Sequence, residues 1–270
     1  AGLGKLFHRS QNWDGLLATY EAEAVSIDDP RQKATRLFKS AEVLEERLGR
    51  VDDAIARYDQ CLMLAPGYLP AQKALVRLYE KQGKWLDLVG MYEQDLTDTT
   101  DREEQIQTLN KMAQIHEDRL TDFPRAIECL KRVLEIASDH LPTVRNLGRL
   151  YERAGRWTDL LGLHDQEAAL SGDTRQVVSL AHRNAEILEE QLKDRAGAVA
   201  AYERVLALSP AYPPALKALG RLYAQDGKWE ELTRMYRAEA EIAPTTDQAA
   251  HLIFKIGELH EQKLKNENAA

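Results

Sequence analysis

The chain has 270 residues, of which 44% are apolar, 30% charged and 7% aromatic, and this composition excludes the disordered and fibrous classes of protein. Its net charge of −8 opposes phosphate backbones and anionic lipids, which argues against general nucleic-acid or membrane-surface binding. No apolar run approaches the ~20 residues that a membrane-spanning helix needs, and the first residues lack the apolar core of a signal peptide.

The tryptophans define an internal repeat. All four are spaced 72 residues apart (85 − 13, 157 − 85 and 229 − 157), at Trp13, Trp85, Trp157 and Trp229. A shift of 72 residues also aligns further columns without insertion or deletion, among them Ala41, Ala113 and Ala185; Ala54, Ala126 and Ala198; and Pro70, Pro142 and Pro214. Recurrence at a fixed period is the signature of a repeat architecture.

This period divides the chain into three complete repeats and two partial ones, with bounds at 1–29, 30–101, 102–173, 174–245 and 246–270. Stacked repeats normally end in polar capping repeats, and neither end of this sequence shows one. We therefore predict a single repeat segment over 1–270 that is excised from a longer array. Unpaired apolar side chains at the ends favour end-to-end self-association, and we expect them at Leu3, Phe7, Ile253 and Phe254.

Each repeat contains four predicted helices in two antiparallel pairs. Apolar residues recur at intervals of three and four, as at Leu44 and Leu48, which is the pattern of an amphipathic helix. Glycine, proline or polar runs separate such stretches, as at Gly49 and Gly83. In the third repeat the pattern predicts helices over 102–120, 123–136, 140–154 and 156–169. For the whole chain we expect about 15 helices.

Residues inside these pairs resemble the tetratricopeptide repeat. In the first pair, Ala54-x3-Tyr58 resembles the second-helix pattern of that family, and in the second pair Gly148-x2-Tyr151 resembles its first-helix pattern. One departure is that a leucine, such as Leu88, replaces the small residue in the second helix of the second pair. The resemblance implies an all-α fold, a right-handed α-solenoid of antiparallel helix pairs that forms a superhelix.

No catalytic motif is recognisable in the sequence. A glycine-rich phosphate loop, Gly-x-Ser-x-Gly and His-Glu-x-x-His are all absent. The seven histidines are scattered among several repeat columns without an i, i+4 pair, so we interpret them as surface or groove side chains and predict no metal site. Paired acids recur in every repeat, which favours a structural or solvated face over one active site. We predict no enzyme and no cofactor.

The cysteines and tryptophans are interpreted mainly as packing residues. Cys61 shares its column with valines and should be buried, whereas Cys129 shares its column with Arg57 and should lie near the surface. The two cysteines lie in different repeats and columns, so no disulfide is expected and the predicted location is the cytoplasm. Each tryptophan precedes a leucine by three residues, which is the spacing of core residues and not of an exposed ladder.

The first helices of the pairs carry two charged ladders. The resemblance implies that first helices line the concave face of the solenoid, so their non-core residues are candidates for partner binding. The second pairs place basic or amide residues there, at Lys73, Arg77, Arg145, Asn146, Arg149, Lys217 and Arg221. The first pairs place acids there, among them Glu45, Glu117 and Glu189. Alternate first helices therefore carry opposite charge.

Two interpretations of these ladders stay open. If neighbouring ladders touch, the arginines neutralise glutamates on the next first helix and set the register between repeats. If the groove separates the ladders, both signs of charge are free to bind an extended or helical peptide of mixed charge.

The function predicted from the sequence is a non-catalytic scaffold that binds a partner protein or peptide on the concave face. The alternative is an architectural rod or self-assembling spacer without a groove ligand. A remote alternative is an RNA-binding helical repeat, which the net charge of −8 and the acidic ladders oppose. Neither nucleic-acid binding nor membrane insertion is expected.

Overall fold

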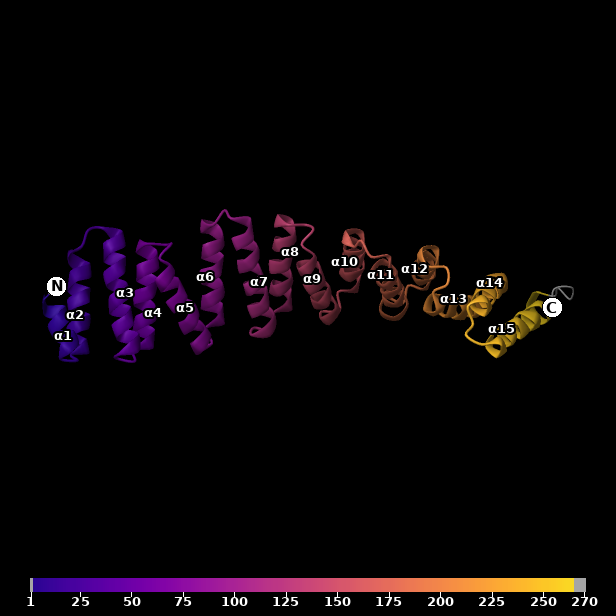
Figure 1. Ribbon diagram of the computed structural model, residues 1–270, viewed down its shortest axis with the longest axis horizontal. Coiled ribbons are helices and arrows are strands. Elements are labelled where there is room, and N and C mark those ends of the chain that lie inside the picture. Colours follow the sequence, from indigo (N-terminus) through magenta and orange to yellow (C-terminus); the bar gives the residue numbers. More distant parts are fainter. Residues whose placement is uncertain (1, 265–270) are drawn as a thin grey trace. The chain divides into compact units, whose positions relative to one another are not determined.

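The computed structural model describes residues 2–264, with side chains for residues 6–263 (Figure 1). The chain divides into two compact parts, an N-terminal part over 1–121 and a C-terminal part over 122–270. Over residues 2–264 there are fifteen α-helices, two π-helical turns and no strand, which confirms the predicted all-α helical repeat. The end of the last predicted repeat, 265–270, and the side chain of Leu3 lie outside the described residues.

The N-terminal part is a stack in which each helix packs on the next one in the chain. Its helices are α1 (Gly2–Arg9), α2 (Trp13–Ser26), α3 (Pro30–Glu46), α4 (Val51–Leu64), α5 (Leu69–Gln82), α6 (Trp85–Asp98) and α7 (Arg102–Asp118). Odd numbers mark the first helices of the pairs and even numbers the second helices.

The C-terminal part continues the same alternation of first and second helices. Its α-helices are α8 (Phe123–Ile136), α9 (Leu141–Arg153), α10 (Trp157–Leu170), α11 (Thr174–Glu186), α12 (Arg195–Leu208), α13 (Pro213–Asp226), α14 (Trp229–Glu241) and α15 (Thr246–Leu259). The π-helical turns η1 (Ile187–Gln191) and η2 (His260–Leu264) extend α11 and α15. The helices predicted for the third repeat correspond to α7 to α10, with boundaries that agree within two residues.

A recurring N-cap starts the first helix of each described repeat after the first. The side chains of Asp29, Asp101 and Asp173 each accept a hydrogen bond of 2.9 Å from a backbone N–H in the first turn of α3, α7 and α11. Thr245 takes this place before α15, at 3.3 Å from the N–H of Gln248. These side chains satisfy N–H groups that have no partner inside the helix. A helix therefore begins at the same position in each of these repeats.

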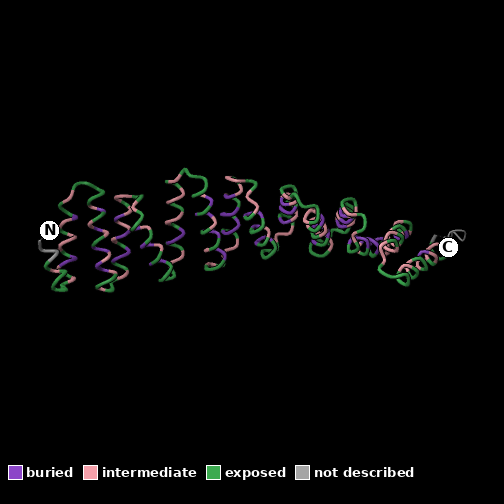
Figure 2. Tube along the Cα trace, viewed as in Figure 1, coloured by how far each residue is buried: buried purple, intermediate pink, exposed green. Residues whose placement is uncertain are grey.

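Small residues occupy the tightest crossings between helices. Ala54, Ala126 and Ala198 are completely buried, and the tube in Figure 2 shows buried residues along the sides of helices that face their neighbours. A Cβ added to Gly148 would lie 3.6 Å from Leu160 and 3.5 Å from Leu163. The large leucine of the second helix therefore packs against a small residue of the first helix, which compensates for the departure from the family pattern.

One of the two cysteines is placed differently from the prediction. Cys61 is buried, as its column predicts. Cys129 is 4% exposed, so the prediction that it lies near the surface is wrong. Its column faces a neighbouring helix, and the longer Arg57 in the same column spans that interface to reach Glu21.

Two histidines are also buried, which contradicts their interpretation as surface or groove residues. His116 is 2% exposed and His164 is 6% exposed. His116 shares its column with Leu44 and His164 shares its column with Tyr20, so both occupy positions that pack in the other repeats. Column membership was the better guide to their burial than residue type.

The predicted apolar end surface is present on α15, where Ile253 and Phe254 are exposed. Phe7, by contrast, is half-buried against the core of the N-terminal part. None of the described helices is long and apolar enough to cross a membrane.

The loops between helices adopt a left-handed conformation in fixed columns. Gly83, Gly155 and Gly227 have φ between 65° and 68°, next to the tryptophans. In the other loop column Gly49 has φ of 67°, but Lys193 has φ of 54° at the equivalent position. A residue with a Cβ is strained in this region, whereas glycine is not.

We predict that Lys193→Gly stabilises the chain by about 1 kcal/mol, because it removes this strain without changing the loop. Urea unfolding followed by circular dichroism measures the gain. Lys193→Ala is the matched control, since it shortens the side chain but keeps the Cβ. A gain in Lys193→Ala equal to that in Lys193→Gly would show that backbone strain is not the cause.

Candidate functional site

The basic and acidic ladders touch in the N-terminal part. Arg77 on α5 forms a two-armed ion pair with Glu45 on α3, with Nη1 2.5 Å from Oε1 and Nη2 2.8 Å from Oε2. The hydroxyl of Tyr58 on α4 donates to the same carboxylate at 3.1 Å. The Glu45 side chain is only 10% exposed, whereas that of Arg77 is 57% exposed. We call Tyr58, Glu45 and Arg77 a Tyr-Glu-Arg triad.

The same triad recurs in the C-terminal part, two repeats later (144 residues). Arg221 on α13 contacts both oxygens of Glu189 in η1 through Nη2, at 2.7 and 2.9 Å. Tyr202 on α12 donates to Glu189 at 3.1 Å. Burial, reinforced by the nearby carboxylate, raises the pKa of both triad tyrosines, so each hydroxyl stays protonated and keeps donating.

In the third repeat, the glutamate and the arginine of these columns lie in different parts of the chain. Glu117 lies buried on α7 and Arg149 lies exposed on α9. The tyrosine column is occupied here by Leu130, which has no hydroxyl to donate. The tyrosine is therefore present in two of the three full repeats.

The second basic column, which holds Lys73, Arg145 and Lys217, is less uniform. Arg145 donates from Nε to Glu167 on α10 at 3.0 Å, and Gln176 donates to the same oxygen at 2.8 Å. Lys73 and Lys217 are exposed and form no ion pair with any residue that the structure describes. Asn146, beside Arg145, is also exposed.

Lys217 lines a groove of about 470 Å³ that the sequence did not predict. First helices α13 and α15 flank this groove, and the end of α14 forms its floor. Lys255 on α15 also lines it, with Nζ 5.6 Å from the ring centre of Tyr236. Lys39, Lys111 and Lys255 share one column, and that recurrence of lysine on first helices was the available signal for Lys255.

A family model for the tetratricopeptide repeat matches residues 73–106, 143–178 and 215–250. These three segments of the chain are therefore similar to tetratricopeptide repeats. The matches begin inside the second pair of each full repeat, where the glycine and tryptophan columns lie. No curated protein matches the sequence.

Solved structures of tetratricopeptide-repeat proteins are similar to this chain at low identity. A MamA protein is 22% identical, with 62% of this chain and 87% of that chain covered and a TM-score of 0.39. A tetratricopeptide repeat protein from Parabacteroides merdae is 13% identical, with 96% of each chain covered and a TM-score of 0.36. YrrB, described as having an unusual peptide-binding site, is 15% identical, with 85% and 95% covered and a TM-score of 0.33.

The four tryptophans are half-buried, and a cation covers the ring in three of the four 72-residue repeats that contain one. Arg47 lies 4.9 Å from the ring centre of Trp13, and Arg119 lies 5.0 Å from that of Trp85. Lys263 occupies the same column and lies 5.4 Å from the ring of Trp229. Each cation comes from the end of the following first helix, so this contact joins consecutive helix pairs.

His164 on α10 forms a polar pair with Asn184 on α11, with 2.7 Å between Nδ1 and Oδ1. The other repeats place tyrosine in the His164 column and serine, methionine or isoleucine in the Asn184 column. Burial lowers the pKa of His164, the bond to Asn184 opposes this shift, and nearby Arg183 reinforces it. The pair is therefore peculiar to one repeat and stays neutral near pH 7.

Over the part of the chain that the structure describes, no three His, Cys, Asp or Glu side chains are grouped so that they could hold a metal ion. The charged side chains form helix-bridging pairs or open grooves, which are suited to recognition of another chain.

We predict that the Glu189–Arg221 pair couples α13 to η1 with an interaction energy of about 0.5–1 kcal/mol, because the carboxylate is mostly buried and the arginine half-exposed. A double-mutant cycle with Glu189→Gln and Arg221→Gln in urea measures it. The exposed Arg156–Asp159 pair, within one helix, is the matched control and should give less. Zero coupling for Glu189–Arg221 would contradict a role in register.

We predict that acid destabilises the chain through His164. Its folded-state pKa lies below the unfolded value, so the unfolded state binds the proton first and the unfolding free energy falls as pH drops below about 6.5. His164→Tyr should lose less stability between about pH 7.5 and 5.5 than the parent does. His251→Asn, at an exposed position, should behave like the parent. An unchanged pH dependence in His164→Tyr would contradict the assignment.

Proposed function

We propose that the chain is a non-catalytic protein-interaction scaffold, and that an acidic segment of a partner protein binds on the first-helix face of its C-terminal part. The groove between α13 and α15 carries this proposal. Its two lysines, Lys217 and Lys255, outnumber its one carboxylate, Glu239, and line a concave surface that also contains Tyr236 and Leu252. Basic groups beside apolar ones suit a peptide that combines carboxylates with apolar anchors.

Two arginines on the same face, Arg221 and Arg145, also support the proposal. Arg221 uses only Nη2 for Glu189, and Arg145 bonds to Glu167 through Nε. Each guanidinium has five N–H donors, so both half-exposed side chains retain donors that these bonds do not use. Their glutamates hold them in fixed orientations, which lowers the entropy cost of binding a partner carboxylate. Exposed Asn146 and Arg149 extend this face along α9.

A reducing compartment, such as the cytoplasm, suits this function. Both cysteines are buried and reduced, and burial raises the pKa of the Cys61 thiol to about 11. A protonated, buried thiol is a packing residue and not a reactive one.

We expect that Lys217→Glu combined with Lys255→Glu abolishes partner capture from a lysate of the source organism, because it places acids in the groove. Quantitative mass spectrometry of affinity-purified material should show a loss of about tenfold or more for the specific partner. This pair is preferred to Arg145 or Arg221, whose reversal would also break an ion pair within the chain.

Lys131→Glu combined with Arg237→Glu is the matched control. It changes the net charge equally, at exposed positions on second helices α8 and α14. The control should keep the partner, and circular dichroism should show both variants folded. Equal capture by the two variants would contradict the proposal, and capture of only the chain itself would favour the rod.

A further inference from the structure

Exposed apolar side chains project from the second helices of the N-terminal part, on the side away from the charged ladders. Met63 on α4 is 75% exposed and Leu86 on α6 is 68% exposed. Val25 on α2 is also exposed. Isolated exposed apolar residues are common in proteins, but these three occur on consecutive second helices.

The other repeats show that the fold does not need apolar residues at these positions. The Met63 column contains Glu135 and Ala207, and the Leu86 column contains Thr158 and Glu230. The equivalent helices form with those polar or small residues in place. Packing within the chain therefore does not explain why Met63 and Leu86 are apolar, whereas contact of these exposed side chains with a partner would.

Met63 and Leu86 line a groove of about 620 Å³ between α4 and α6. Met91 adds a third apolar side chain, and residues of α5 form the floor. A Cβ added to Gly90, on the wall of the groove, would meet no atom within 4 Å, so the space beside α6 is open. Methionine side chains are flexible and polarisable, which suits a surface that adapts to an apolar partner.

Four carboxylates line the same groove: Asp59, Asp87, Asp95 and Asp98. Neutral groups donate hydrogen bonds to two of them: the Tyr79 hydroxyl to Asp59 at 3.4 Å, and the Gln72 amide to Asp95 at 3.0 Å. None of the four forms an ion pair with a residue between 6 and 263. Burial raises the pKa of both Asp59 and Asp95, and the charges of Lys84 near Asp59 and of Lys111 near Asp95 oppose this shift only in part.

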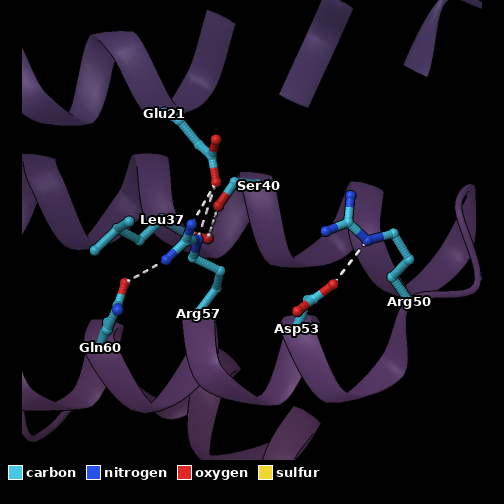
Figure 3. A network of polar contacts seen from close by, with 7 residues as sticks. All are labelled: Glu21, Leu37, Ser40, Arg50, Asp53, Arg57 and Gln60. Atoms are coloured by element: carbon cyan, nitrogen blue, oxygen red, sulfur yellow. Dashed lines mark hydrogen bonds and ion pairs between the residues drawn. The ribbon is translucent and has the colours of Figure 1, made fainter. Parts of the chain in front are cut away.

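The neighbouring groove between α2 and α4 differs in charge. It has a volume of about 570 Å³ and also contains Met63. There, however, Arg57 donates to Glu21 at 2.6 and 3.0 Å and to Gln60 at 3.0 Å, as Figure 3 shows. That groove supplies its own cation, whereas the α4–α6 groove does not.

We propose that the α4–α6 groove binds a basic amphipathic helix of a partner protein, with apolar side chains inserted beside Met63 and Leu86 and with lysine or arginine paired to the four aspartates. A helix fits better than a strand because the walls are helices, which offer side chains and no free backbone edge for strand addition. The α4–α6 groove lies in the N-terminal part and prefers cations, whereas the Lys217 groove lies in the C-terminal part and prefers anions. The two proposals can therefore be tested independently.

The direct test is a titration of the full chain, labelled with ¹³C on its methionine methyl groups, with a synthetic peptide. The probe is a helix of about 18 leucine and lysine residues, with the leucines on one face. Signals of Met63 and Met91 should shift, while those of Met112, which is buried, and Met235, in the C-terminal part, should not. Shifts confined to Met235, or no shifts at all, would overturn the proposal.

The variants Met63→Glu and Leu86→Thr introduce residues that other repeats already carry at these columns, so folding should be preserved. Together they should weaken peptide binding about tenfold or more by fluorescence anisotropy. Ile253→Thr, which alters a similarly exposed apolar residue on α15, is the matched control and should bind like the parent. Parent-like binding by the double variant would overturn the proposal.

Charge is tested separately with Asp87→Asn combined with Asp98→Asn. This variant should bind the lysine peptide more weakly and with a smaller dependence on salt. A peptide of the same length with glutamate in place of lysine, and one with the leucines scattered around the helix, should not bind measurably. Equal binding of either control peptide would show that the groove does not select a basic amphipathic helix.

Discussion

Stacking is the constraint on which the whole structure depends, because a single helix pair cannot bury its own apolar face. Every pair must lie close enough to its neighbours to exclude water, and the completely buried Ala54, Ala126 and Ala198 permit that approach. Where leucine replaces the small residue in a second helix, as at Leu160, the opposing first helix carries Gly148. At this interface a glycine lies opposite the large side chain, as it also does where Gly220 meets Leu232.

The same constraint explains what could be predicted from the sequence. Packing columns repeat, so helices α7 to α10 and the burial of Cys61 follow from period and spacing. The burial of His164 was missed because residue type was given more weight than its tyrosine column. The contact between Arg77 and Glu45 was left open because it depends on the spacing of two first helices and on a rotamer, and neither is encoded in periodicity. The Lys217 groove could be identified only from the folded structure.

The charged ladders therefore divide into two kinds of residue. Glu45 and Glu189 are mostly buried and receive both a tyrosine hydroxyl and an arginine, so they act between helices. A partner would have to displace those bonds to use these acids, at the cost of leaving a buried carboxylate without its cation. Lys217, without an ion pair among the described residues, imposes no such cost. The recognition that we propose on the first-helix face therefore uses the cations and not the acidic ladder.

An internal repeat also provides its own reference for function. When three copies of a helix keep the same packing residues, a deviation confined to the surface of one copy has no folding requirement behind it. Met63 and Leu86 deviate in this way toward apolar residues, beside four aspartates that form no ion pair with a described residue. His164 and Asn184 deviate inside an interface, where a neutral pair replaces an aromatic contact and makes stability depend on pH. A residue that differs between repeats at the surface thus indicates partner binding, and one that differs inside an interface indicates an effect on stability. A binding assay can detect the role of the first kind, and an unfolding experiment the role of the second.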